Sequence, residues 1–567
     1  MKNKTILSKQ KSLIIVLSCL AAVFALACIV FPLVFKEELN TVYKLTEYGD
    51  EAIVSIYDNA GSRSLKGDLE NIRQGTAKNT LDVKESTEEN VLYTFRKNDV
   101  TITYQPFIFP EIPLTELSRV TITNENDTFT LFGDKTGNFF IEGAEKNLYV
   151  SLVYGVTERL LTLDFIINTL SARGVDKTDL SVLIPLRLGL YQMIFMDKIP
   201  PSAAVDTSVE LTKKFSNRAA ANYTNAVLRS FLRAVGQNIS LEKVFDSEPF
   251  AKAFASLDKY EKMSVTHSYP AWLCKHFADS YGVENARHIL STLNGKGRLT
   301  LRTNTLKISR DELIKKLSER GVRSEKTVFS PFGVDVLNSS AAALTDLFES
   351  GEVFVQDEAS QIAALALAPN PGDNMLDTCA CPGGKSFSSA ILMENRGKII
   401  SCDLHKSKLS LIEGGAKKLG IDIIDTLEAD SSKINDNINS VFPTGADKVL
   451  CDVPCSGLGV IAKKPEIRYK NEEDVRRLPE IQLKILKNCA SYVKHGGVLV
   501  YSTCTLNPDE NENNILKFLE EFSEFSVCDF EITSENGDTL RSTDGMLTLF
   551  PHINRTDGFF IAKMIRS

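Results

Sequence analysis

MLDTCACPGGKS, residues 375–386, is the stretch of this sequence that decides its fold. Its apolar start predicts the end of a buried strand, and Phe387–Met393 predicts the helix after the turn. Glycines at such a strand-to-helix turn let a ligand approach the backbone closely, as in open α/β sheets of the Rossmann type. A phosphate loop needs a glycine five residues before Gly384. Cys379 stands there instead, which argues against an NTPase.

Acidic residues at the ends of the next predicted strands favour S-adenosylmethionine as the ligand. Asp403 ends the strand 398–402, about 20 residues after the glycine turn, where an acid binds ribose hydroxyls. Asp430 ends the next unit, where it can meet an adenine amino group, and Asp452 ends the fourth. This ordered set fits S-adenosylmethionine better than a dinucleotide. Each acid alone also has a simpler interpretation, as a helix N-cap or an exposed loop carboxylate.

Two cysteines follow the short apolar runs 448–451 and 498–501, which predict buried strands. Cys455 lies in DVPCSG and Cys504 lies in YSTCT. Ligands of open α/β sheets bind beyond the carboxyl ends of the strands, so we expect both thiols to face one crevice. Two thiols suit methylation of a pyrimidine at C5. A thiolate that adds at C6 makes C5 nucleophilic, and a base must then remove the C5 proton before the thiolate leaves.

Residues 147–567 resemble the bacterial 16S rRNA cytosine-C5 methyltransferases of the Sun type, small-subunit methyltransferase B. The matching motifs are DTCACPGGKS, DVPCSG, KPEIRY, YSTCT and DGFFIA. The resemblance implies a Rossmann-like core that uses S-adenosylmethionine and methylates a cytosine of 16S ribosomal RNA through a covalent cysteine–C6 adduct. Transfer RNA and 23S rRNA remain alternative substrates.

The resemblance also implies roles for single residues. Cys504 is the expected nucleophile and Cys455 the residue that helps to release the product. Cys455 remains a rival nucleophile, because DNA cytosine-C5 methyltransferases attack with the cysteine of their Pro-Cys motif. Asp452, in the same crevice, is expected to hold the N3 and N4 edge of cytosine, and if protonated it donates to N3. The expected cofactor contacts are Cys379, Ala380, Cys381, Pro382, Gly383, Gly384, Lys385, Asp403, Asp430 and Asp452.

The expected RNA contacts are Arg468 and Lys464, which lie in the segment after Cys455. A solvent-exposed basic loop is the rival interpretation of Arg468. Three positions depart from the family pattern, which usually has alanine, threonine and a small polar residue there; they are Cys381, Ser386 and Leu458. None of them removes a reacting group, though Cys381 can alter the fit around the methionine part of the cofactor.

The remaining cysteines are expected to be structural. Eight of the 11 cysteines lie between residues 379 and 528. A zinc site built from the pairs Cys379/Cys381 and Cys451/Cys455 would need other spacings, so no metal is expected. Cys402, Cys451 and Cys489 are predicted to be strand-buried free thiols. Cysteines in this number, without a small disulfide framework, favour a reducing compartment.

The segment before the catalytic core has helical periodicity between residues 150 and 236. Residues 146–236 carry 11 Lys/Arg against 7 Asp/Glu, a net charge of +4, whereas the whole chain has −8. This segment resembles the NusB-like RNA-binding domain of the family, and we assign it to 146–240 with its N-terminal helices missing. Residues 265–350 resemble the small α/β subdomain, with a strand at 299–304 and a helix at 310–320, and 351–567 is the methyltransferase domain. Trp272 is interpreted as core packing rather than a base-stacking platform.

The N-terminus has a different character. Leu13–Phe35 is 23 residues without a charge, enough to span a bilayer, and lysines precede it, so the first residues are expected in the cytoplasm. Residues 1–36 are therefore assigned as tail and transmembrane helix. Residues 37–145 are assigned as a β-rich segment, with a hairpin around 124–127, and resemble anchored bacterial envelope proteins. A membrane-anchored envelope binding protein is the alternative function for this part alone.

The two parts of the chain are in conflict. A single span would export the methyltransferase away from S-adenosylmethionine and ribosomal RNA, whereas the catalytic part is expected in the cytoplasm. The NusB-like domain normally begins with helices upstream of residue 148, where β-type sequence stands here. We therefore infer a junction near residues 143–148 and hypothesise that two unrelated reading frames have been joined. The enzyme is expected to be a monomer.

Overall fold

The computed structural model describes residues 42–48, 51–58, 61–64, 81–86, 90–97, 100–107, 117–123, 128–133, 139–141, 144–236, 238–295, 297–338 and 344–567. The chain divides into two compact units, and the division falls between Ser268 and Tyr269. The predicted span Leu13–Phe35 lies outside the described residues. None of the helices in the described ranges is long and apolar enough to cross a membrane.

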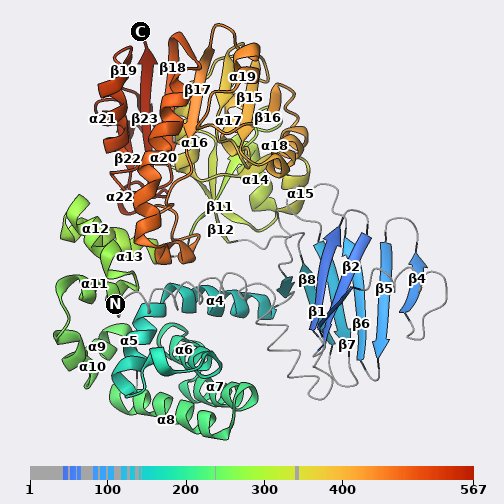
Figure 1. The fold of residues 1–567 in the computed structure, drawn as a ribbon, viewed down its shortest axis with the longest axis vertical. Coiled ribbons are helices and arrows are strands. Elements are labelled where there is room, and N and C mark those ends of the chain that lie inside the picture. Colours follow the sequence, from blue (N-terminus) through green and yellow to red (C-terminus); the bar gives the residue numbers. More distant parts are fainter. Residues whose placement is uncertain are drawn as a thin grey trace. The chain divides into compact units, whose positions relative to one another are not determined.

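The strands described between residues 42 and 141 are antiparallel (Figure 1). A three-stranded sheet contains β1 (Val42–Tyr48), β2 (Glu51–Asp58) and β3 (Gly61–Ser64). A six-stranded sheet in chain order contains β4 (Leu81–Ser86), β5 (Asn90–Lys97), β6 (Val100–Phe107), β7 (Leu117–Thr123), β8 (Thr128–Gly133) and β9 (Phe139–Ile141). Thr123 of β7 pairs with Thr128 of β8, which confirms the hairpin predicted around 124–127.

Helices follow from residue 144 to the end of the first unit. They are α4 (Ala144–Glu158), α5 (Leu160–Leu170), α6 (Leu180–Phe195), α7 (Pro201–Phe215), α8 (Arg218–Val235), α9 (Leu241–Asp246), α10 (Phe250–Ala255) and α11 (Lys259–His267), with a 3₁₀ turn, η2, at Val175–Lys177. The predicted apolar faces form their core, since Leu186, Leu190 and Phe231 are fully buried. Arg187 donates two hydrogen bonds to Asp164, at 2.7 and 2.8 Å, so a buried cation inside this bundle is neutralised.

The second unit opens with two helices and a small sheet. The helices are α12 (Ala271–Tyr281) and α13 (Val283–Leu293). The antiparallel sheet has the order β11 (Arg323–Lys326), β12 (Gly333–Asn338), β10 (Leu299–Thr303), β13 (Val353–Val355), and α14 (Arg310–Glu319) and α15 (Thr345–Glu349) accompany it. The strand predicted at 299–304 and the helix predicted at 310–320 are confirmed to within one residue. Ser309 and Glu312 form a capping box that fixes the start of α14.

A Rossmann-like sheet makes up the rest of the second unit (Figure 1). Its strands, in spatial order, are β16 (Ile424–Glu428), β15 (Lys398–Asp403), β14 (Asn374–Asp377), β17 (Ala446–Asp452), β18 (Val493–Thr503), β23 (Phe559–Arg566) and β19 (Phe525–Val527), and β22 (Met546–Leu549) pairs with β23. The five strands from β16 to β18 are mutually parallel, and β23 is antiparallel to β18. A two-stranded ribbon, β20 (Glu531–Thr533) and β21 (Thr539–Arg541), lies outside this sheet.

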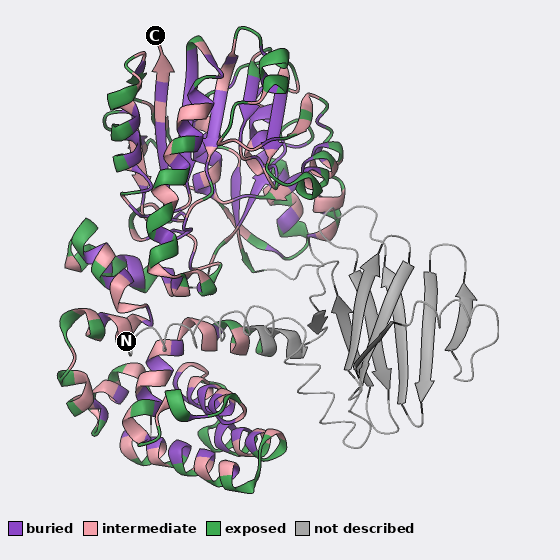
Figure 2. Ribbon diagram, viewed as in Figure 1, coloured by how far each residue is buried: buried purple, intermediate pink, exposed green. Residues whose placement is uncertain are grey.

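Helices cover both faces of this sheet, so the middle of β15, β17 and β18 is buried on both sides (Figure 2). Met375 packs in one core and its neighbour Leu376 in the other, as the strand period of two requires. The first core contains α16 (Glu358–Leu367), α17 (Gly384–Leu392) and α18 (Lys406–Leu419). The second contains α19 (Asp436–Val441), α20 (Glu472–Ala490) and α21 (Glu512–Glu521). The remaining short elements are η4 (Pro465–Tyr469) and α22 (Pro551–Asn554).

Candidate active site

The carboxyl ends of five neighbouring parallel strands, from β16 to β18, carry the predicted site residues. From β14 the chain proceeds to β15 and β16 on one side and then returns to β17 on the other, so the strand order reverses at β14. Ligands of open α/β sheets bind at such a reversal. We call the ends of β15 and β16, with Asp403 and Asp430, the acid side. The loops after β17 and β18, with Cys455 and Cys504, are called the thiol side.

The two predicted thiols lie together. The Sγ atoms of Cys455 and Cys504 are 3.2 Å apart, close enough for one thiol to donate a hydrogen bond to the other sulfur. A hydrogen bond from Cys455 lowers the pKa of Cys504, whereas burial and the charge of Asp452 raise it and the charge of Lys385 makes a smaller contribution in the lowering direction. The pKa of Cys455 is raised, because its proton is held by Cys504 and because it is buried. Cys504 is therefore the thiol that ionises first.

Asp452 joins the glycine turn to the thiols. It ends β17, and its carboxylate accepts a hydrogen bond from Lys385 Nζ at 2.8 Å and one from Ser502 Oγ at 2.6 Å. Burial alone would lower the pKa of Lys385, but the Asp452 carboxylate raises it. Lys385 also lies 5.1 Å from the centre of the Phe559 ring. The predicted residues Lys385, Asp452, Cys455 and Cys504 thus form one cluster.

The glycine turn has the geometry that a glycine alone allows. Gly383 precedes α17 with φ +109°, and a Cβ there would lie 2.3 Å from the Phe387 ring. Ala380 donates its N–H to the Cys402 carbonyl, and Pro382 is exposed. The helix starts at Gly384, three residues earlier than predicted. Free backbone N–H groups at a helix start bind anionic groups.

The acid side presents carboxylates beside this turn. Asp403 accepts a hydrogen bond from the His405 N–H at 2.9 Å, and Lys408 lies 3.9 Å away. Asp430 is paired with Lys433 at 2.8 Å, and this contact with that of Ser432 holds its pKa at about 2. Neither acid is the N-cap of the following helix, because His405 is the N-cap of α18 and Asn435 that of α19. Each is a half-buried loop carboxylate at the end of its strand.

The residues fit S-adenosylmethionine in type. A glycine turn, a helix start and two acids at successive strand ends supply donors for its carboxylate and acceptors for its hydroxyl and amino groups. Asp377 adds a buried Oδ1 that has no hydrogen-bond partner in the described part of the chain. Burial raises the pKa of Asp377 to about 7, although Ser386 donates to its other oxygen at 2.6 Å.

The remaining cysteines have structural positions. Cys402, Cys451 and Cys489 are fully buried free thiols, and the Cys451 and Cys489 sulfurs are 3.6 Å apart. The predicted strand position is confirmed for Cys402 and Cys451 but is wrong for Cys489, which lies in α20. Burial raises the pKa of Cys379 well above its usual value, which makes it a poor nucleophile. Cys381 Sγ contacts the Lys408 carbonyl at 3.8 Å. Within the described ranges, no three His, Cys, Asp or Glu side chains have the geometry of a metal site.

Arg468 has a position that the sequence did not predict. It is fully buried, its guanidinium stacks 4.2 Å above the centre of the Tyr269 ring, and it donates to Asn294 at 2.9 Å. This burial excludes the exposed basic loop, while contact of Arg468 with RNA or with the surroundings of the flipped base stays a prediction. The residue ties the loop after Cys455 to the helices α12 and α13. Lys464, the other predicted RNA contact, is exposed.

A buried glutamate, Glu510, holds the two cysteine loops together. Its carboxylate accepts hydrogen bonds from the Ser456 N–H and Gln482 Nε2, both at 2.8 Å, and from Asn507 Nδ2 at 2.9 Å. Ser456 follows Cys455, and its hydroxyl is 2.6 Å from Thr505, which follows Cys504. Sequence analysis missed Glu510. The only sign of Glu510 in the sequence was its place six residues after Cys504. An acidic residue at the start of any helix would look the same.

A second set of contacts connects the loop after Cys455 to the loop after Cys504 and to the residues just before β23. Gly459 donates to the Cys504 carbonyl at 3.0 Å, and Gly558 donates to the Gly459 carbonyl at 2.9 Å. A Cβ on Gly459 would lie 1.8 Å from the Gly558 oxygen, so both glycines are required. Lys463 binds Asp357 and Asp557, each at 2.7 Å. Burial and Asp357 raise the pKa of Asp557 to about 7.

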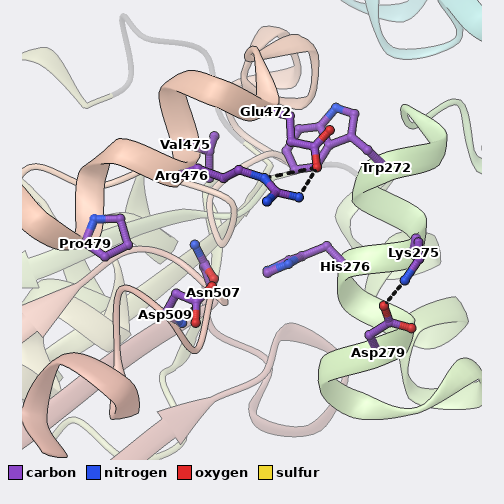
Figure 3. Close-up of a pocket in the computed structure, with 10 residues that line it drawn as sticks. All are labelled: Trp272, Lys275, His276, Asp279, Glu472, Val475, Arg476, Pro479, Asn507 and Asp509. Carbon is purple, nitrogen blue, oxygen red and sulfur yellow. Dashed lines mark hydrogen bonds and ion pairs between the residues drawn. The ribbon is translucent and has the colours of Figure 1, made fainter. Parts of the chain in front are cut away.

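A cavity of about 430 Å³ lies beside the thiol side (Figure 3). Its walls come from α12, from the first half of α20 and from the loop after β18. Trp272 lines it and is only half-buried, which corrects the interpretation of this residue as core packing. Asn507 in its wall is three residues after Cys504 in the sequence and donates a hydrogen bond to Glu510.

Comparisons with known proteins agree with this architecture. The family model described as "16S rRNA methyltransferase RsmB/F" matches residues 364–565. The "NusB family" model matches residues 116–233, which include β7 to β9, and a model for a ferredoxin-like domain of RsmF/B-like methyltransferases matches 269–342. The crystal structure of PH0851, 26% identical, aligns with a TM-score of 0.60 over 75% of this chain and 91% of that protein.

Two curated relatives cover most of the chain. The probable ribosomal RNA small subunit methyltransferase B of Synechocystis is 35% identical over 74% of this chain and 91% of the relative. The protein of the same description from Bacillus subtilis is 38% identical over 74% of this chain and 90% of the relative. The resemblance seen in the sequence motifs is thereby confirmed, and the chain belongs to the small-subunit methyltransferase B family, as an S-adenosylmethionine-dependent ribosomal RNA methyltransferase.

Proposed function

We propose that this protein methylates C5 of a cytosine in 16S ribosomal RNA through a covalent bond between Cys504 and C6. The observation that carries the proposal is the pair of Sγ atoms at 3.2 Å beside the Lys385–Asp452 ion pair. Two thiols so close have different proton affinities, which gives them different roles. Reaction at C5 of a pyrimidine requires a nucleophile at C6, and the lowered pKa of Cys504 favours this residue over Cys455.

The steps follow from these positions. The target cytosine leaves its stack and enters the crevice. The Cys504 thiolate forms a bond to C6, and the electrons of the C5–C6 double bond become available at C5, where the methyl group is added. A base then takes the C5 proton, its electrons restore the double bond, and the bond between Sγ and C6 breaks. S-adenosylmethionine supplies the methyl group when it is bound.

The neighbouring side chains assist at stated atoms. We assign to Asp452 the acceptance of a hydrogen bond from the N4 amino group of cytosine, and the contact with Lys385 at 2.8 Å orients its carboxylate. Cys455 donates its proton toward the Cys504 sulfur, which stabilises this sulfur as it leaves C6. This is the basis for assigning product release to Cys455. The cofactor contacts assigned to Cys379 through Lys385, Asp403 and Asp430 belong to the same proposal.

Mapping 5-methylcytosine tests the proposal directly. Purified full-length protein is incubated with tritiated S-adenosylmethionine and unmodified 16S rRNA, 23S rRNA or transfer RNA, and the modified nucleoside is identified by mass spectrometry. We expect 5-methylcytosine in 16S rRNA. Label in transfer RNA or 23S rRNA alone would establish the alternative substrate, and a methylated base other than 5-methylcytosine would overturn the chemistry.

The N-terminal residues are part of a separate proposal. We retain the hypothesis that residues 1–145 and the catalytic part come from two joined reading frames, with the catalytic part in the cytoplasm and active as a monomer. The matched NusB region begins at residue 116, upstream of the predicted junction. Long-read sequencing of the locus and detection of a full-size polypeptide in membrane or soluble fractions test this. A continuous gene with one membrane-bound product of full size would overturn a sequence-assembly error as the origin of the junction and leave a gene fusion or deletion.

A further inference from the structure

The cavity beside the thiol side contains groups that the methylation chemistry does not use. Its volume of about 430 Å³ lies within the range of about 300–1,000 Å³ that is typical of small-ligand sites. Trp272 contributes a half-buried indole to its wall. In Figure 3 the ring of His276 extends from α12 toward Asn507 and Asp509. Within the described part of the chain, the buried Nε2 of His276 has no hydrogen-bond partner.

Charge argues against a phosphate in this cavity. The two cations of its wall are already paired, Arg476 with Glu472 at 2.7 Å and Lys275 with Asp279. Asp509 adds a third carboxylate. A phosphate would meet more negative than positive charge, whereas a carboxylate and a neutral imidazole suit the amino and ring nitrogen groups of a base. Burial lowers the pKa of His276, which favours that neutral imidazole.

The cavity borders the loop that follows Cys504, on the thiol side of the sheet. Asn507, in its wall, donates to the same Glu510 carboxylate that the Ser456 N–H reaches, next to Cys455. The Tyr281 hydroxyl of α12 donates to the Leu506 carbonyl at 2.9 Å, which fixes this helix beside the loop after Cys504. None of the residues assigned as cofactor contacts lines this cavity.

We propose that this cavity binds a nucleobase next to the target cytosine, with Trp272 as its stacking surface and His276 and Asp509 at its hydrogen-bonding edge. The proposal rests on the proposed RNA methylation. A cytosine that leaves its stack deprives its neighbour of a stacking partner, and an aromatic side chain replaces that partner. The Asp509 carboxylate favours a base that carries an amino group, adenine, guanine or cytosine, over uracil.

Trp272 is the only tryptophan of the chain, so its fluorescence reports on this cavity without any substitution. The full-length protein is titrated with an unmodified 16S rRNA fragment that contains the mapped target, and filter binding is measured in parallel. We expect the tryptophan emission to fall in step with binding. Bound RNA with unchanged emission would overturn the proposal. Among short single-stranded oligonucleotides, oligo(A) and oligo(C) should quench the emission of Trp272 more than oligo(U) does.

Substitutions distinguish stacking from packing. Trp272→Leu keeps apolar bulk but removes the stacking surface, and a base–aromatic stack is worth roughly 5- to 150-fold in affinity. We expect KM for RNA to rise by this factor while kcat at saturating RNA is retained, and Trp272→Phe to stay near the wild type. Equal KM values for the wild type, Trp272→Leu and Trp272→Phe would contradict the proposal. A rise in KM for Trp272→Phe as large as that for Trp272→Leu would also contradict it.

Matched controls separate this site from the reaction itself. Ile481→Ala alters an exposed residue of α20 that does not line the cavity, and it should leave KM unchanged. Failure of wild-type protein to form 5-methylcytosine would refute the proposed function, whereas methylation with no effect of Trp272→Leu would refute only the base site. If Trp272→Leu does not fold, the fluorescence titration of the unsubstituted protein still decides.

Discussion

The acid side and the thiol side of the crevice are held in place in different ways. On the acid side, Asp403 accepts from a backbone N–H two residues away, and Asp430 pairs with Lys433 three residues away. On the thiol side, Cys455 and Cys504 are 49 residues apart in sequence, and Glu510 binds groups from three separate segments. Local contacts form wherever the short motif forms. The thiol pair forms only when the whole sheet is assembled, so substitutions should have local effects on one side and cooperative effects on the other.

The largest expected effect is the loss of Cys504. Cys504→Ala has no thiolate to attack C6, so we expect neither methylated product nor a covalent adduct with RNA. Cys455→Ala still attacks and methylates, but without its hydrogen bond the Cys504 sulfur leaves slowly, and protein–RNA adduct accumulates. Denaturing gels with labelled RNA show the adduct as a shifted band. A shifted band from Cys504→Ala, and none from Cys455→Ala, would reverse the two roles.

Glu510 tests whether the thiol side is cooperative. Glu510→Ala leaves three buried donors without their acceptor, and each unpaired buried donor costs about 1–3 kcal/mol. We expect a lower melting temperature and a loss of adduct formation, although Glu510 does not touch the substrate. Glu510→Gln keeps the shape and should fold better. It also removes a charge that raises the pKa of Cys455, so alkylation of Cys455 should begin at lower pH.

The matched control for Glu510 is Glu520→Ala, an exposed acid of α21. Its melting temperature and its adduct yield should equal those of the wild type. If Glu510→Ala forms the adduct at the normal rate, the buried carboxylate does not position the cysteine loops. A parallel fall in both variants would point to a general effect of charge.

Asp403 tests whether the acid side acts locally. Removing a charged hydrogen bond to the ribose costs about 1.5–3 kcal/mol, or roughly 10- to 150-fold in affinity for S-adenosylmethionine. Asp403→Ala should therefore bind the cofactor weakly while its fold and its RNA affinity are retained. Calorimetric titration measures this. An unchanged dissociation constant in a folded variant would remove Asp403 from the cofactor site.

Arg468 and Lys464, the two predicted RNA contacts, should now differ in behaviour. Arg468→Ala removes a buried cation that stacks on Tyr269, so we expect lower stability with little change in the salt dependence of RNA binding. Lys464→Ala alters an exposed residue and should reduce the salt slope by about one unit, as for the loss of one phosphate contact. Filter binding over a range of salt concentrations measures both. A reduced slope for a stable Arg468→Ala would restore Arg468 as an RNA contact.

The smallest expected effect is on the pH dependence of stability. The pKa of Asp557 is raised to about 7 in the folded chain. Its contribution to the free energy of unfolding is therefore present at low pH and is lost as pH rises toward 7. The pKa of Asp430 is lowered to about 2, so its contribution has the opposite sign and is lost as pH falls toward 2. Urea unfolding between pH 4 and 7 should show a flatter profile for Asp557→Asn than for the wild type. Identical pH profiles for Asp557→Asn and the wild type would show that Lys463 already compensates the charge of the Asp557 carboxylate.

Sequence patterns predicted those features that depend on neighbouring residues. The strand–turn–helix at residues 375–392, the acids at the strand ends and the apolar helix faces all follow from periodicity and from the freedom of glycine. The start of α17 was misplaced by three residues, because Gly383 caps the helix in a left-handed conformation that the apolar pattern does not reveal. Motifs also identified both cysteines, since each follows a strand that the pattern made visible.

By itself, then, the sequence determined the sheet, the glycine turn, the strand-end acids and the two thiols. Tertiary structure decided which thiol ionises first, since that depends on the 3.2 Å contact between the sulfurs and on the charge of Lys385. It also decided that Arg468 is buried, that Glu510 links the cysteine loops and that Trp272 lines a cavity. The physical reason is that proton affinity and burial are set by neighbours brought from distant parts of the chain, whereas turns and strands are set by the residues beside them.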